Sequence, residues 1–113
     1  MATPESKIKA IVKRRLEKEY HFSEPSSCYQ FCPVQNGMGA PGLDFFLCIH
    51  GKFFAIETKK RGVGFTSWEA NDLKATDRQL VTMNQVRSAG GAAYVVDNEE
   101  SLEEAITDIN WRI

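Results

Sequence analysis

Two strongly apolar segments meet at His50 and Gly51, and they constrain the fold more than any other feature of the chain. Residues 43–49 and 52–59 are rich in Phe, Leu and Ile, and a His-Gly pair between them suits a tight turn. The pattern predicts a β-hairpin. Because both strands are apolar at most positions, we expect both faces of the sheet to be covered, as in α/β proteins.

Helical and strand patterns surround this hairpin. Apolar residues recur at helical spacing over residues 5–20, which Thr3 and Pro4 are suited to begin. The other expected elements are a strand over residues 28–35, a loop over 36–42, a helical turn opened by 66–69, a helix over 77–89 opened by Thr76 and Gln79, a strand over 92–96 and a helix over 99–109 capped by Asn98. The order α-β-β-β-α-β-α predicts an α/β sandwich with a central mixed sheet and flanking helices.

The length and the cysteine content limit the class of protein. A chain of 113 residues suits one domain, so we expect a single domain over residues 1–113. No apolar run approaches the ~20 residues that span a bilayer. Three cysteines, an odd number, argue against a secreted disulfide framework. These observations predict an intracellular, cytoplasmic protein.

Positive charge gathers in the first half of the chain. Residues 1–61 hold ten Lys and Arg against six Asp and Glu, whereas residues 62–113 hold four against nine. A nucleic-acid-binding protein needs its positive charge on one face, and the basic first helix together with Lys59, Lys60 and Arg61 would supply it. A solvated helix face explains the same charges, and composition alone favours that interpretation.

Asp44, Glu57 and Lys59 are the residues whose placement points to chemistry. Asp44 opens the first hairpin strand and Glu57 ends the second, so the hairpin should return both carboxylates to one end of the sheet. Side chains alternate along a strand, which places Lys59 on the face of Glu57. The alternative is structural: Asp44 caps a turn, and Glu57 and Lys59 form an exposed pair.

Two adjacent carboxylates repel each other, and a hard divalent cation such as Mg²⁺ or Mn²⁺ relieves that repulsion. The carbonyl of Thr58 is a candidate for a further oxygen ligand. A cation held in this way polarises a phosphodiester and lowers the pKa of a bound water. A lysine beside it stabilises the charge that develops. The constellation therefore favours phosphodiester hydrolysis.

Four blocks of sequence, in this order, resemble the VRR-NUC group of PD-(D/E)xK nucleases, in particular its small stand-alone members from phages and bacteria. They are residues 39–44, 53–59, 76–79 and 89–96, and together they span most of the chain. The resemblance implies a restriction-endonuclease-like core and divalent-metal-dependent cleavage of DNA. It also implies a preference for branched DNA such as Holliday junctions, and a homodimer.

The resemblance assigns roles to individual residues. Asp44 and Glu57 match the metal-binding carboxylates, and Lys59 matches the catalytic lysine. Gln79 matches the glutamine on the helix after the hairpin, and Glu5 an acidic residue of the first helix that completes the metal shell. One departure is that two residues separate the aspartate from the proline that the motif places directly before it.

Two of these assignments have equally good alternatives. Glu5 is also a first-turn carboxylate favoured by the helix dipole, and Glu17 and Glu19 lie on the same helix. Gln79 is also the capping-box partner of Thr76, and we do not expect one rotamer to serve both roles.

Other functions are less well supported by the sequence. Cys28, Cys32, Cys48 and His50 lack the short spacing of a zinc knuckle, and buried small hydrophobic side chains are the better interpretation of the cysteines. A non-catalytic nucleic-acid-binding module on the same fold is the main alternative to an endonuclease. An enzyme acting on RNA or on a nucleotide is a third possibility, because phosphodiester chemistry does not identify the sugar.

Overall fold

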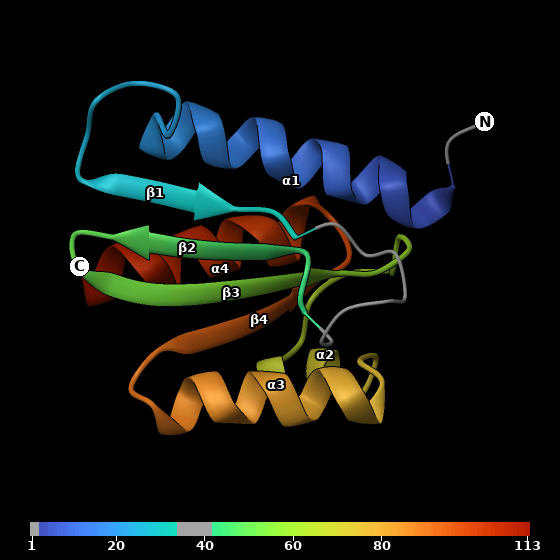
Figure 1. Cartoon of the computed structure of the whole chain (residues 1–113). Coiled ribbons are helices and arrows are strands. Elements are labelled where there is room, and N and C mark those ends of the chain that lie inside the picture. Colours follow the sequence, from blue (N-terminus) through green and yellow to red (C-terminus); the bar gives the residue numbers. More distant parts are fainter. Residues whose placement is uncertain (1–2, 34–41) are drawn as a thin grey trace.

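A four-stranded sheet with helices on both faces forms the centre of the molecule (Figure 1). The computed structural model describes residues 3–33 and 42–113. The elements in chain order are α1 (Pro4–Tyr20), β1 (Cys28–Phe31), β2 (Phe45–Ile49), β3 (Lys52–Thr58), α2 (Trp68–Asp72), α3 (Asp77–Ser88), β4 (Ala92–Val96) and α4 (Glu99–Arg112). The α/β class with a mixed sheet is thus confirmed.

The strands lie in the order β1-β2-β3-β4. Strands β1, β2 and β3 pair antiparallel, and β4 pairs parallel to β3 after the crossover through α2 and α3. The expected turn at His50 and Gly51 joins β2 to β3, with φ of 51° and 79°. Two successive positive φ values are what a two-residue hairpin turn of type I′ requires.

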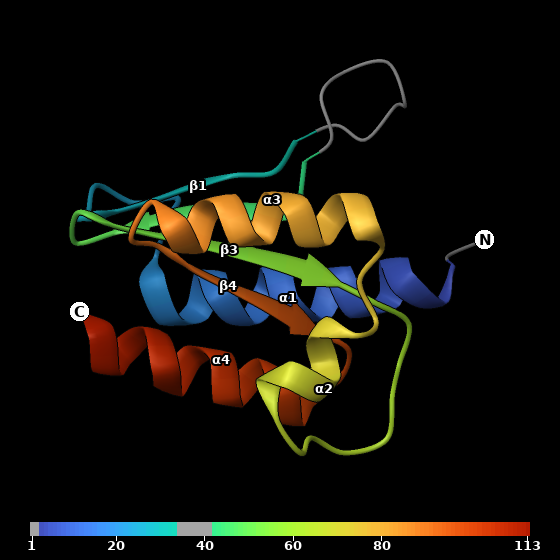
Figure 2. The ribbon, with the colours of Figure 1, turned by 90° about the horizontal axis from the view of Figure 1, so that it is seen from below.

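Each face of the sheet packs against its own helices, as Figure 2 shows with α1 and α4 on one side and α3 on the other. The larger core joins α1 and α4 to the sheet through side chains such as Leu16, Phe45 and Ile106. The smaller core lies under α3 and includes Leu43, Ala55, Met83 and Val95. The sheet is therefore a layer between two helical layers, and side chains at its ends project toward both.

Several predicted boundaries differ from the structure. Strand β1 ends at Phe31, and the last two residues of the predicted strand, with most of the predicted loop 36–42, lie outside the described residues. Ser67 caps the five-residue helix α2, since its side chain accepts from the N–H of Ala70, so the predicted cap one residue earlier is wrong. Helix α4 runs to Arg112, three residues beyond the prediction, because its last turn still forms backbone hydrogen bonds.

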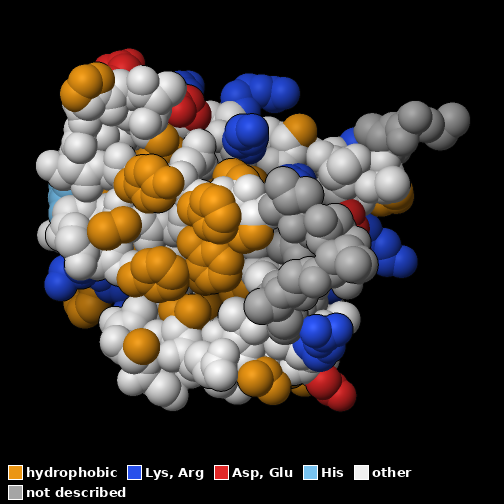
Figure 3. Space-filling view, in the orientation of Figure 1, with side chains coloured by type: hydrophobic (Ala, Val, Ile, Leu, Met, Phe, Trp, Pro, Cys, Tyr) orange, Lys and Arg blue, Asp and Glu red, His pale blue; other side chains and the backbone are white. Residues whose placement is uncertain are grey.

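The expectation that both faces of the hairpin are covered is wrong for one face. Figure 3 shows a group of apolar side chains on the side of β1, β2 and β3 that α3 leaves open. Tyr29, Phe31 and Phe53 are 66%, 54% and 44% exposed, and with Phe46 and Cys48 they line an apolar hollow of about 370 Å³. Helix α3 packs mainly over β3 and β4, so much of this face of the outer strands stays open. No helix in the described residues is long and apolar enough to cross a membrane.

Candidate active site

The structure brings Asp44 and Glu57 to the same end of the sheet. Asp44 directly precedes β2, and Glu57 is the penultimate residue of β3. Since Phe45 lies opposite Ile56 in the antiparallel ladder, Asp44 lies opposite Glu57. The hairpin therefore positions both carboxylates by its register alone, although they are thirteen residues apart in the chain.

The carboxylate of Asp44 is held by the next strand and approached by helix α1. Its Oδ2 accepts from the backbone N–H of Thr58 at 2.9 Å and from the Thr58 hydroxyl. Its Oδ1 lies 3.6 Å from Nζ of Lys9. In a strand the N–H and C=O of one residue point to the same side, so the carbonyl of Thr58 also faces the Asp44 side of β3.

The carboxylate of Glu57 is buried without full compensation of its charge. The residue is 5% exposed, and its Oε2 accepts from Nε2 of Gln79 at 2.7 Å. Nζ of Lys59 lies 3.9 Å from the same oxygen. Burial and then the charge of Asp44 raise the pKa of Glu57 to about 7, whereas Lys59 acts in the opposite direction. Two neighbouring negative charges at this end of the sheet therefore lack a sufficient positive counterpart.

Gln79 closes the capping box and reaches Glu57 with one rotamer, two contacts that were not expected together from the sequence. Its Oε1 accepts from the backbone N–H of Thr76 at 2.9 Å and completes the capping box of α3. Its Nε2 donates to Glu57 at the same time. The two ends of an amide point in different directions, and α3 begins close enough to β3 for each end to find its own partner.

Glu5 lies closer to this site than the two other acidic residues of α1. It is exposed in the first turn, and its charge contributes to the raised pKa of Glu57. Glu17 and Glu19 lie at the other end of α1, roughly 18 Å or more along its axis at the usual helical rise. Glu17 accepts from the N–H of Ser23, and Glu19 pairs with Arg15.

The described residues contain no group of three or more His, Cys, Asp or Glu side chains able to hold a metal ion. Glu5 is therefore not joined to Asp44 and Glu57 in a preformed cluster. The three cysteines are free thiols. Cys28 and Cys32 are partly buried, as expected of small apolar side chains, whereas Cys48 is exposed.

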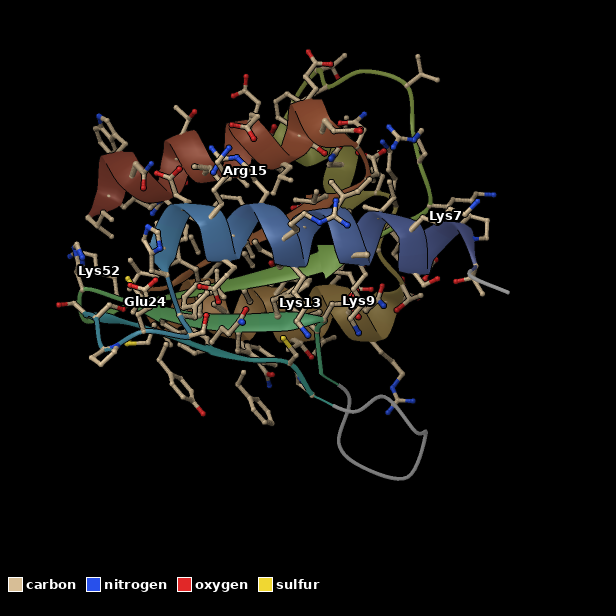
Figure 4. All side chains as sticks on the ribbon, turned by 90° about the horizontal axis from the view of Figure 1, so that it is seen from above. Lys7, Lys9, Lys13, Arg15, Glu24 and Lys52 are labelled. Carbon is tan, nitrogen blue, oxygen red and sulfur yellow. The ribbon has the colours of Figure 1, made fainter. Side chains whose placement is uncertain are left out.

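Several basic residues expected to contact nucleic acid are paired with carboxylates instead. Arg15 binds Glu103 and Glu19, and Arg61 binds Glu99. The exposed cations of α1 include Lys7 and Lys13, whereas the partly buried Lys9 contacts Asp44; Figure 4 shows the three lysines along the helix. The contact of Lys9 with Asp44 was missed by sequence analysis, because nothing in the spacing distinguishes this lysine from its neighbours on the helix.

A second buried carboxylate lies just after β4, the strand beside β3. Asp97 is fully buried and accepts from Lys74, from Nδ2 of Asn71 at 3.3 Å and from the hydroxyl of Ser101 at 3.2 Å. Its backbone carbonyl accepts from the N–H of Gly62 at 2.9 Å. A Cβ on residue 62 would lie 1.9 Å from Asp97 Oδ2, which explains a glycine there. This network anchors the segment that follows Lys59.

A comparison with solved structures finds the same fold in a known domain. A structure described as a VRR_NUC domain superposes with a TM-score of 0.62 over 94% of this chain and 97% of its own, at 18% sequence identity. No family model and no curated protein matches the chain. The four-stranded mixed sheet with its flanking helices is therefore the fold of a VRR_NUC domain, as the sequence resemblance predicted.

Proposed function

We propose that this protein is a divalent-metal-dependent endonuclease that hydrolyses DNA phosphodiester bonds. The observation that carries the proposal is the convergence of Asp44 and Glu57 at one end of the sheet, with Lys59 and Gln79 beside them. The VRR_NUC fold of the chain supports the same function. A buried carboxylate whose pKa is raised by burial and by a neighbouring carboxylate, as for Glu57, is typical of functional sites.

The donor set fits Mg²⁺ or Mn²⁺. Carboxylate oxygens are the ligands these hard cations prefer, and two opposed carboxylates with excess negative charge favour a cation between them. Asp44 and Glu57 would hold it, with the carbonyl of Thr58 as a further oxygen; Glu5 would have to move toward them to complete the set. The cation would activate a water and offset charge on the phosphate.

Lys59 and Gln79 act on the groups around the reaction. The ammonium of Lys59, close to Glu57, stabilises negative charge that develops on the phosphate and orients the attacking water. Gln79 donates to one oxygen of Glu57 and so fixes the orientation of the carboxylate toward the cation. Because α3 is anchored by its capping box, this donor is held in place before substrate arrives.

Lysines of α1 would contact the nucleic-acid backbone. Lys7, Lys9 and Lys13 lie on the helix whose N-terminal end reaches the site. Phosphate contacts of this kind release counterions, so binding should weaken as salt is added. Arg61 would have to leave Glu99 to contribute.

We propose further that the protein is a homodimer and that branched DNA, such as a Holliday junction, is its preferred substrate. The apolar hollow lined by Tyr29, Phe31 and Phe53 supports the dimer, because an uncharged apolar surface complements a second copy of itself and has no charge to offer DNA. Phe31→Ser should weaken the dimer in sedimentation equilibrium while leaving the monomer folded. A monomeric wild-type protein at high micromolar concentration would contradict this part.

A cleavage assay tests the main proposal. Labelled four-way junction, linear duplex DNA and single-stranded RNA are incubated with Mg²⁺, with Mn²⁺ or with EDTA, using wild type, Glu57→Gln and Lys59→Ala. Lys18→Ala is a matched control, because it removes a lysine at the far end of α1. We expect metal-dependent cutting of DNA by wild type and Lys18→Ala only. Equal cutting by all four proteins, or none by wild type, would contradict the proposal, and cutting of RNA alone would reassign the substrate.

A further inference from the structure

The two oxygens of Asp44 have different surroundings. Thr58 donates twice to Oδ2, from its backbone and from its hydroxyl. Oδ1, which Thr58 does not bind, faces Nζ of Lys9 at 3.6 Å. The oxygen of Asp44 that is better placed to accept a cation is therefore already next to a cationic side chain.

We propose that Lys9 is a positioning residue that occupies the place of the divalent cation at Asp44, and that it is released toward the nucleic-acid backbone when the cation binds. An ammonium group and a divalent cation repel each other, so a cation bound at Oδ1 of Asp44 would weaken the contact of Lys9 with that oxygen. This inference rests on the proposed function, since it requires a cation at Asp44.

The contact between Lys9 and Asp44 is weak enough for Lys9 to leave. Its side chain is 39% exposed, and 3.6 Å is longer than the 2.7–3.2 Å of a hydrogen bond, so the contact is mainly one of charge. Lys74 differs, because it donates directly to Asp97, whose side chain is 1% exposed. A lysine on a flexible four-carbon stem can leave Asp44 at little cost.

The released ammonium would join a second lysine. Lys13 follows Lys9 by four residues, which places both on one face of α1, and Figure 4 shows them projecting from the same side of the helix. Lys13 does not pair with Asp44. A nucleic-acid strand that reaches the carboxylates along this face would therefore contact Lys13 with or without the cation. It would contact Lys9 only after the cation has displaced Lys9 from Asp44.

Removing Lys9 should then have two effects of opposite sign. Cation binding becomes tighter because the competing charge is gone, and binding of nucleic acid becomes weaker because a phosphate contact is lost. Lys13→Gln removes the same charge one helical turn away and should produce only the second effect. A purely structural role for Lys9 would not tighten cation binding while weakening the binding of nucleic acid.

The first arm of the test is calorimetric titration of wild type, Lys9→Gln and Lys13→Gln with Mn²⁺ alone. We expect Lys9→Gln to lower the Kd for Mn²⁺ about fivefold, the effect of releasing one partly exposed ion pair, and Lys13→Gln to change it less than about twofold. Unchanged or weaker Mn²⁺ binding by Lys9→Gln, with wild type binding normally, overturns this inference alone. Absence of Mn²⁺ binding by wild type overturns the proposed function with it.

The second arm measures binding of a fluorescent four-way junction, in a Lys59→Ala background that prevents cleavage. With Mn²⁺ present, Lys9→Gln should weaken binding and reduce the salt dependence by about one phosphate contact. With EDTA, Lys9→Gln should have little effect, because Lys9 is then engaged with Asp44. Lys13→Gln should weaken binding in both conditions. Equal losses for Lys9→Gln with and without Mn²⁺ overturn the inference.

Discussion

The neighbouring parallel strands β3 and β4 each have a buried carboxylate at their ends, Glu57 and Asp97. The two carboxylates differ in the donors and charges that surround them. Glu57 is 5% exposed and Asp97 is fully buried. Asp97 is surrounded by donors from α2, α4 and Lys74. Glu57 accepts from Gln79 and from the backbone of Asp44, with Lys59 farther away, and it faces a second carboxylate.

The difference separates a structural role from a chemical one. A buried charge that is paired and hydrogen-bonded holds its surroundings in place, and removing its partners is costly. A buried carboxylate beside another carboxylate lowers the stability of the fold instead. Such groups are typical of functional sites, where a bound ligand offsets the repulsion. Asp97 therefore anchors the chain near the site, whereas Glu57 belongs to the site itself.

The largest expected effect is on cleavage. Glu57→Gln keeps the shape of the side chain and an acceptor for Gln79 but loses the charge, so cleavage of the preferred DNA should fall about 10³-fold or more, in the range for loss of an essential catalytic group. Asp97→Asn, assayed well below its melting temperature, should stay within about tenfold of wild type. Comparable losses in single-turnover rate for the two variants would contradict the claim that Glu57 has a chemical role and Asp97 a structural one.

The second effect is on stability, where substitution of Asp97 should have a larger effect than substitution of Glu57. Asp97→Ala removes the acceptor that Lys74, the Ser101 hydroxyl and the Asn71 amide share, so we expect the free energy of unfolding to fall by about 1–3 kcal/mol. Glu57→Gln should lose far less, because it removes an unfavourable charge. Urea unfolding of both variants in EDTA measures the difference, and a larger loss for Glu57→Gln would contradict the account.

Stability should also depend on pH through Glu57. Its pKa of about 7 in the folded protein lies above the ordinary value of roughly 4.3 in an unfolded chain. Between these values the folded state holds a proton that the unfolded state has lost, so stability falls as pH rises from about 5 to 8.

Glu57→Gln lacks this titration. In EDTA its stability relative to wild type should therefore increase between pH 5 and pH 8, by on the order of 1–3 kcal/mol. Addition of Mg²⁺ at pH 8 should raise the melting temperature of wild type and not that of the variant. Parallel pH profiles for the two proteins would mean that Glu57 titrates like an exposed carboxylate.

A smaller effect separates the two roles of Gln79. Gln79→Glu keeps an oxygen for the N–H of Thr76 but sets a third carboxylate against Glu57, so the pH-dependent loss of stability should move to higher pH. Gln79→Ala loses the bond from the Thr76 N–H but keeps Thr76 as the cap, and should cost about 1 kcal/mol without adding a charge that titrates. The same pH series of unfolding experiments checks both, and identical profiles would show that the contact with Glu57 is without consequence.

Much of the fold could be predicted because its signals are local. Thr3 and Asn98 cap their helices as their side-chain chemistry predicts, and the turn at His50 and Gly51 sets the register that brings Asp44 opposite Glu57. The open face of the outer strands could not be predicted, since it depends on how far α3 reaches across the sheet.

The candidate site was only partly predictable for the same reason. The roles of Asp44, Glu57, Lys59 and Gln79 remain predictions, but their proximity follows from strand register and from the start of α3. The contact of Lys9 with Asp44 could not be foreseen, because it depends on how α1 lies across the sheet. Pairing between distant layers is set by packing and not by spacing along the chain.

The most direct test of the central claim is diffraction from crystals grown with Mn²⁺. The account predicts an anomalous peak at the end of β2 and β3 that contacts the side chains of both Asp44 and Glu57. A peak at another place, or none at a Mn²⁺ concentration that supports cleavage, would contradict the claim that these two carboxylates form a divalent-metal site.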